Sequence, residues 1–145
     1  MTTLTKQVRL TERDRYIRSI ARRVRHEQFT QYKDPDGQCD CWSYELYEAL
    51  KQSLVECEMV AGHFLILRDD DVAKDEMCHW WVEVGKWVVD ITADQFNWIV
   101  GRDTFTPLMM VHPSHTERWR WVRSDDSKLV ANHFNHLERT QCQMV

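Results

Sequence analysis

Two stretches near the start of the chain repeat apolar residues every three or four positions, the period of a helix with one buried side. The first predicts a helix over about 12–29, opened by a capping box at Thr11 and Asp14 and followed by a turn at 34–37. The second predicts a helix over about 39–53. The apolar stripes consist of Tyr16, Ile17, Ile20, Ala21 and Val24 in the first helix and of Trp42, Leu46, Leu50 and Leu54 in the second.

The middle of the chain changes to the patterns of strands. An apolar run over 63–67 predicts a strand, and the acidic segment 69–76 after it predicts a loop. Residues 79–84 and 87–92 predict two strands joined by a two-residue turn that begins with Gly85. Beyond this hairpin, the sequence predicts a short helix over 93–100, strands over 108–111 and 118–122, and a last helix over 127–137.

The order of these elements predicts the fold class. Helices at both ends with strands between them indicate an α+β fold, in which the N-terminal helices pack on a mainly antiparallel sheet. A length of 145 residues fits a single domain, 1–145, with one core. The apolar fraction of 43% is typical of a globular chain rather than a disordered one.

The turn fixes the register of the hairpin and therefore the faces of its two strands. Pairing Val84 with Trp87 places alternate residues on opposite faces of the sheet. The apolar face carries Trp80, Val82, Val84, Trp87, Val89 and Ile91, and the mixed face carries His79, Trp81, Glu83, Val88, Asp90 and Thr92. His79 and Asp90 become diagonal neighbours about 7 Å apart, so the carboxylate is within reach of the imidazole.

A cysteine completes a set of side chains suited to nucleophilic catalysis. Cys39 lies at the predicted start of the second helix, where the helix dipole and an adjacent imidazolium favour a thiolate. Asp90 would fix the tautomer of His79, whose other ring nitrogen would take the thiol proton. N–H groups at the helix start would bind the oxyanion of an acyl-transfer intermediate. The sequence therefore predicts a Cys-His-Asp triad.

Three segments resemble the Cys, His and Asp motifs of transglutaminase-like cysteine enzymes, which belong to the papain-like fold. They are Gly37-Gln38-Cys39 with Ser43 four places on, His79-Trp80-Trp81-Val82-Glu83-Val84, and Asp90-Ile91-Thr92-Ala93-Asp94-Gln95-Phe96. The tail of the third motif is similar to that of small bacterial and phage proteins of this kind. The resemblance covers about residues 37–96 and implies a papain-like core.

The sequence offers two candidates for the nucleophile. Gly37 and Ser43 fall in place around Cys39, whereas the tryptophan that follows the catalytic cysteine in the papain pattern follows Cys41 here. We take Cys39 as the nucleophile and keep Cys41 as the alternative.

The resemblance implies an enzyme that hydrolyses or transfers an acyl group. The thiol would attack an amide or ester carbonyl, and water or an amine would resolve the thioacyl intermediate without a cofactor. We expect a protein or peptide substrate, cleaved at a peptide, isopeptide or side-chain amide bond. Gln38 and Gln95 are candidate oxyanion donors, and Trp80 is a candidate wall of the substrate cleft.

Other interpretations of the same residues stay open. A catalytically inactive relative would use the same cleft only to bind a peptide or protein. A zinc site would draw on Cys39, Cys41, Cys78 and His79. The Cys-x-Cys spacing is tight for zinc, however, and strand residues 78 and 79 point to opposite faces. Trp119 and Trp121 alternate with arginines, as in binders of single-stranded nucleic acid, although the net charge of −4 argues against such a partner.

Charge is unevenly distributed along the chain. Residues 1–28 carry eight Lys or Arg against three acidic residues, and 69–76 carry five acidic residues against one lysine. Such segments are either solvated faces or docking sites for a charged partner. No run reaches the length of a membrane span, and the five cysteines show no disulfide framework. We therefore expect no membrane partner and a cytoplasmic, reducing compartment.

Overall fold

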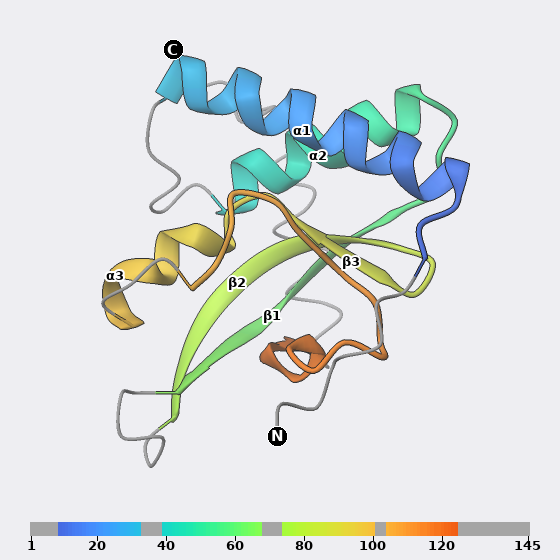
Figure 1. The fold of residues 1–145 in the computed structure, drawn as a ribbon. Coiled ribbons are helices and arrows are strands. Elements are labelled where there is room, and N and C mark those ends of the chain that lie inside the picture. Colours follow the sequence, from blue (N-terminus) through green and yellow to red (C-terminus); the bar gives the residue numbers. More distant parts are fainter. Residues whose placement is uncertain (1–8, 33–38, 68–73, 101–103, 125–145) are drawn as a thin grey trace.

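The computed structural model describes residues 9–32, 39–67, 74–100 and 104–124, which form the predicted α+β fold (Figure 1). The helical elements are α1 (Glu12–Tyr32), α2 (Cys39–Gln52), η1 (Ala93–Phe96), α3 (Asn97–Val100) and η2 (Arg118–Arg120), of which η1 and η2 are 3-10 turns. The strands are β1 (Glu58–Leu67), β2 (Lys74–Val84), β3 (Trp87–Asp90), β4 (Met109–Val111) and β5 (Trp121–Arg123).

Local hydrogen bonds explain where α1 begins. The Thr11 N–H donates to the Asp14 carboxylate over 2.9 Å, and the Asp14 N–H donates to the Thr11 hydroxyl over 3.1 Å. This reciprocal pair is the predicted capping box. The helix continues to Tyr32, past its predicted end, and the predicted turn at 34–37 lies outside the described residues.

The five strands form one antiparallel sheet in the order β4-β3-β2-β1-β5. Val84 pairs with Trp87 and Val82 pairs with Val89, so the predicted register of the hairpin is confirmed. Gly85 has φ +58°, a conformation that glycine adopts without strain at the first central position of a two-residue turn.

β3 is shorter than the predicted strand 87–92. The Thr92 N–H donates back to the Asp90 carboxylate over 2.8 Å, and the Gln95 N–H donates to the Thr92 carbonyl over 3.0 Å. These bonds turn the chain into η1 directly after Asp90. As a result β2 has no β3 residue beside Trp80, and that part of its edge is open to another element.

Two further predictions need correction. Residues 74–76 belong to β2 rather than to the acidic loop predicted over 69–76, because β1 and β2 continue their pairing as far as Leu67 and Lys74. The predicted strand 118–122 begins only at Trp121, because the Arg120 N–H donates to the Glu117 carbonyl over 3.1 Å and closes the turn η2. Residues 68–73 and the predicted helix 127–137 lie outside the described residues.

The two faces of the sheet pack on different layers. α1 and α2 cover one face (Figure 1). The core on that side contains Ile17, Ile20, Ala21, Val24, Trp42, Leu46, Leu50, Val82, Val84, Val89 and Ile91. The opposite face packs against η1, α3 and the segment around Phe105, through a core that contains Val60, Phe64, Trp81, Val88, Phe96 and Trp121. By strand alternation, His79 and Asp90 point into this second core.

Gly62 permits close packing in the centre of the sheet. It lies opposite His79 of β2 and Arg123 of β5. A Cβ at this position would overlap the carbonyl oxygen of Val122 and would come within 2.8 Å of the Trp81 ring. Because Gly62 has no side chain, β5 and the Trp81 indole can both approach β1 closely at the residue that pairs with His79.

We predict that Gly62→Ala lowers the free energy of unfolding by about 2 kcal/mol or more, because the clash involves backbone rather than a flexible side chain. Urea unfolding followed by tryptophan fluorescence measures the loss. Gly85→Ala is the comparison, since its Cβ meets no heavy atom within 4 Å and only the positive φ penalises it, by about 1 kcal/mol. Equal losses in the two variants would contradict the packing role of Gly62.

Candidate active site

His79 and Asp90 form a buried hydrogen-bonded pair. His79 Nε2 lies 2.6 Å from Asp90 Oδ2, and the side chains are 0% exposed. The pair joins β2 to the last residue of β3, on the face that the hairpin register predicts. The second ring nitrogen, Nδ1, is also buried and makes no hydrogen bond to any described nitrogen or oxygen atom.

Asp90 has further partners on both carboxylate oxygens. The Trp121 Nε1–H donates to Oδ2 over 2.8 Å, and the Thr92 N–H donates to Oδ1 over 2.8 Å. The Thr92 hydroxyl lies 3.3 Å from the same Oδ1. Burial raises the pKa of Asp90, but His79, Trp121 and Thr92 together hold it below its ordinary value. The carboxylate is therefore ionised and fixed in orientation.

Aromatic rings surround the His79 imidazole. Phe96 and Phe64 contact it edge-on, with ring centroids 5.0 and 5.5 Å away, and Trp81 stacks at 5.9 Å. Burial lowers the pKa of His79, but Asp90 and then Cys39 raise it to about 9. The ring is therefore an imidazolium at neutral pH, held by a carboxylate on one side and adjacent to a thiol.

The early end of β3 explains how α2 reaches this pair. The Ser43 hydroxyl donates to the Trp80 carbonyl over 3.1 Å, at the edge of β2 that β3 leaves open. Cys39 precedes Ser43 by one helical turn and lies on the same side of α2. Docking α2 through Ser43 therefore directs the Cys39 thiol to His79, with which it interacts.

Cys41 lies on a different side of α2. Its partly buried side chain packs against the cluster of Tyr44 and Met59 on the helix-covered face of the sheet. Its N–H donates to the Asp40 carboxylate over 2.8 Å. Of the two cysteines considered as nucleophile, Cys39 is the one that interacts with the His79 ring.

The predicted substrate-binding residues have different outcomes. Gln38 lies outside the described residues. Gln95 is buried in η1, and its role as an oxyanion donor stays a prediction. The half-buried Trp80 side chain packs against Tyr44 and Met59, on the opposite side of β2 from His79.

Two contributors were missed in the sequence. In the sequence, Trp121 is noted only for its alternation with arginines, whereas in the structure its Nε1–H donates to Asp90 Oδ2 over 2.8 Å. Arg25 was counted with the basic helix face, although its spacing from Ile17 and Ala21 places it on the buried stripe. Its guanidinium donates to the Ile91 carbonyl over 2.7 Å and to both oxygens of Asp94 over 2.7 and 2.8 Å. Arg25 thereby holds the segment that follows Asp90.

The remaining cysteines lie apart from the pair. Cys78 is exposed and precedes His79 on the strand, so its side chain points to the other face. Burial raises the pKa of Cys57 to about 11. Within residues 9–32, 39–67, 74–100 and 104–124, no three His, Cys, Asp or Glu side chains are grouped as metal ligands. No helix in this part of the chain is long and apolar enough to cross a membrane.

Comparison with known proteins gives no relative. No protein-family model matches the chain, and neither the curated proteins nor the solved structures that were searched contain a match. The chemistry of the site is accordingly inferred from its geometry. A thiol at a helix N-terminus, next to an imidazolium that a buried carboxylate orients, can act as a nucleophile toward a carbonyl carbon.

The His79–Asp90 pair predicts how stability depends on pH. The raised pKa of His79 means that its stabilisation is complete below about pH 6.5 and is lost as the pH rises toward 9. A shift of this size corresponds to about 3 kcal/mol. The lowered pKa of Asp90 adds stabilisation that is lost only when the pH falls below its ordinary value near 3.8.

Asp90→Asn tests this assignment. Without the carboxylate, burial outweighs the remaining effect of Cys39 and lowers the pKa of His79. We therefore predict that the titration of His79 no longer reduces the stability between pH 6.5 and 9. Urea unfolding across that range measures the slope, and Glu58→Gln, which removes an exposed carboxylate bound to Arg123, is the control. An Asp90→Asn slope equal to that of the wild type would contradict an imidazolium at this position.

Proposed function

We propose that this protein is a cysteine-dependent acyl-transfer enzyme that hydrolyses a peptide, isopeptide or side-chain amide bond. Cys39 is the nucleophile, His79 is the general acid and base, and Asp90 orients His79. One observation carries the proposal: Asp90 holds His79 in a buried hydrogen bond, beside the edge of β2 where Ser43 docks α2, whose first residue is Cys39. The resemblance of three motifs to transglutaminase-like enzymes supports it independently, and a papain-like core is part of the proposal.

The resting state follows from the charge of His79. An imidazolium next to Cys39 favours the thiolate, and the N-terminal end of α2 favours negative charge at the same place. The enzyme would therefore bind its substrate as a thiolate–imidazolium pair. Asp90 keeps the positive charge on the ring, while Phe64 and Phe96 pack edge-on against it.

Acylation begins when the Cys39 thiolate attacks the carbonyl carbon of the substrate. The carbonyl oxygen becomes an oxyanion, which the N–H groups at the start of α2 stabilise. His79 then gives its proton to the leaving nitrogen, the C–N bond breaks, and an amine departs. The products of this half-reaction are a thioester on Cys39 and a neutral His79 still bound to Asp90.

Hydrolysis reverses these roles. Neutral His79 takes a proton from water as its oxygen attacks the thioester carbonyl, and the C–S bond breaks to return the Cys39 thiolate and the carboxylic acid. The proton remains on His79, so the thiolate–imidazolium pair is restored. No redox change and no cofactor enter the cycle.

Alkylation of the thiols tests the proposal directly. At pH 6, an ordinary thiol of pKa 8.5 is ionised to only about 0.3%, whereas a thiol paired with an imidazolium is ionised to a much larger extent. We predict that limiting iodoacetamide labels Cys39 first, as located by peptide mass spectrometry. His79→Ala should slow this labelling at least about tenfold.

The matched controls use residues that lie nearby but apart from the pair. His63→Ala, on the neighbouring strand but on the face opposite Phe64, should leave the labelling rate unchanged. Cys57, with its pKa of about 11, provides a slow thiol within the same molecule. Asp90→Asn keeps the shape of the site and covers the case in which His79→Ala fails to fold. Uniform slow labelling of all cysteines, unaffected by His79 or Asp90, would overturn the proposal and favour a binding module.

A further inference from the structure

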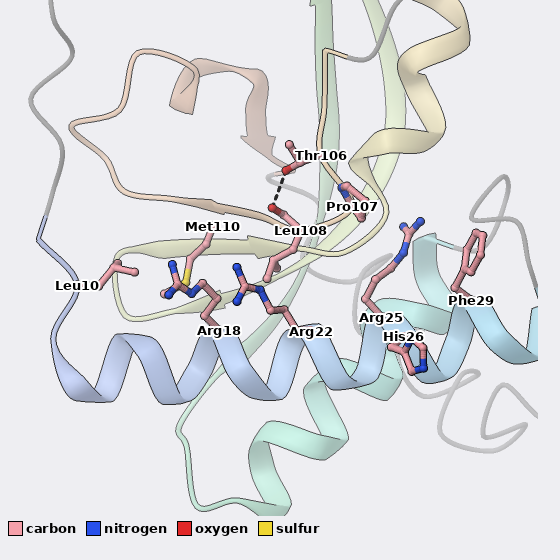
Figure 2. Close-up of a pocket in the computed structure, with 10 residues that line it drawn as sticks. All are labelled: Leu10, Arg18, Arg22, Arg25, His26, Phe29, Thr106, Pro107, Leu108 and Met110. Carbon is pink, nitrogen blue, oxygen red and sulfur yellow. Dashed lines mark hydrogen bonds between the residues drawn. The ribbon is translucent and has the colours of Figure 1, made fainter.

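A groove with a volume of about 830 Å³ runs along α1, and neither His79 nor Asp90 is among the described residues that line it (Figure 2). One wall is α1, whose Arg18, Arg22 and Arg25 side chains rise from the helix toward the segment 106–110. The other wall is formed by this segment, which leads into the edge strand β4. The groove therefore lies between a basic helix and one edge of the sheet.

The described lining residues give the groove a positive charge. None of the described residues that line it is Asp or Glu. Arg25 is neutralised by Asp94, at N–O distances of 2.7 and 2.8 Å. Arg18 and Arg22, in contrast, have no carboxylate within 4.0 Å among the described residues, although the whole chain has a net charge of −4. Within the part of the chain that the structure describes, these two guanidinium groups therefore lack a counter-charge.

The other wall is suited to a peptide. Leu108 and Met110 offer apolar surface that is only half buried. The backbone N–H and C=O of Val89 point to β2. Those of its neighbours Val88 and Asp90 therefore point to β4, where these residues pair with Val111 and Met109. The N–H and C=O of Met110, between these two residues, accordingly point to the outer edge of β4, with which no described strand pairs. A chain in extended conformation is able to pair with them there.

We propose that this groove binds an extended acidic segment of another protein, with two carboxylates at alternate positions, Glu-x-Glu or Asp-x-Asp. Arg18 and Arg22 are one helical turn apart, which separates them by about 6 Å along α1. Alternate residues of an extended chain are about 6.7 Å apart and lie on the same side. The two carboxylates therefore match the two guanidinium groups, and each pair is able to form a bidentate ion pair.

Four observations favour an acidic peptide over other anions. The groove is larger than a single phosphate needs, and its second wall is apolar. The backbone of Met110 offers a peptide the donor and acceptor that continue a sheet. The net charge of −4 opposes a long polyanion such as nucleic acid, but a short segment contacts only the local positive charge. The binding is independent of whether Cys39 is a nucleophile.

Fluorescence anisotropy tests the proposal with a labelled peptide whose core is Leu-Glu-Val-Glu-Leu. We expect the Arg18→Gln, Arg22→Gln double variant to bind at least tenfold more weakly than the wild type in 0.1 M salt. The matched control is Arg13→Gln, Arg23→Gln, which removes the same charge from exposed positions of α1 outside the groove and should change the affinity less than twofold. A peptide with both glutamates replaced by glutamine should lose affinity to the same extent.

Cys39→Ser separates this proposal from the enzymatic one, since it removes the thiol and should leave peptide binding unchanged. Equal weakening by the two double variants would overturn the proposal, because the attraction would then be non-specific. Displacement of the peptide by inorganic phosphate at the same concentration would also overturn the proposal, because the groove would then be a simple anion site. Self-association of the wild type that the Arg18→Gln, Arg22→Gln variant abolishes, measured by sedimentation velocity, would identify a second copy as the occupant.

Discussion

The arrangement of this protein depends on one buried interaction, the hydrogen bond of 2.6 Å between His79 and Asp90. Neither side chain is exposed, and a charged pair without water is stable only when its remaining hydrogen-bonding atoms find partners. Trp121 from β5 and Thr92 from the segment after β3 supply them for the Asp90 carboxylate. The second core of the sheet is therefore organised around the charged His79–Asp90 pair, and the aromatic rings of this core surround the pair.

A second constraint is the early end of β3. Had the strand continued to Thr92, it would have paired with β2 beside Trp80 and excluded α2 from that edge. Because the Thr92 N–H bonds to Asp90 and turns the chain, the Ser43 hydroxyl takes the Trp80 carbonyl in place of a strand. The interaction that fixes the carboxylate thus also opens the position through which α2 brings Cys39 to His79. Arg25 strengthens this coupling, since it binds the Ile91 carbonyl and Asp94 and stacks against Trp42 of α2.

Much of this arrangement could be predicted from the sequence, because it depends on local signals. The apolar period placed α1 and α2, and the turn at Gly85 set the register that brings His79 and Asp90 to one face.

The length of β3 could not be predicted, since it is decided by a side-chain bond from Asp90 to the next residues. Trp121 is 31 residues from Asp90, and no local pattern reveals that contact. Arg25 occupies a position of the apolar stripe of α1, which indicates burial, but only the structure shows its partners. The choice between Cys39 and Cys41 likewise depends on the docking of α2 through Ser43.

The central claim is that Cys39, His79 and Asp90 act as one unit with a charged imidazole at neutral pH. Nitrogen-detected NMR of the His79 ring, titrated from pH 5 to 10, tests it most directly in the wild type and in Cys39→Ser. The account predicts that both ring nitrogens carry protons at pH 7, that the midpoint lies near the pKa of about 9, and that it falls in Cys39→Ser. A neutral ring at pH 7, with a midpoint below 6.5 that Cys39→Ser does not move, would contradict it.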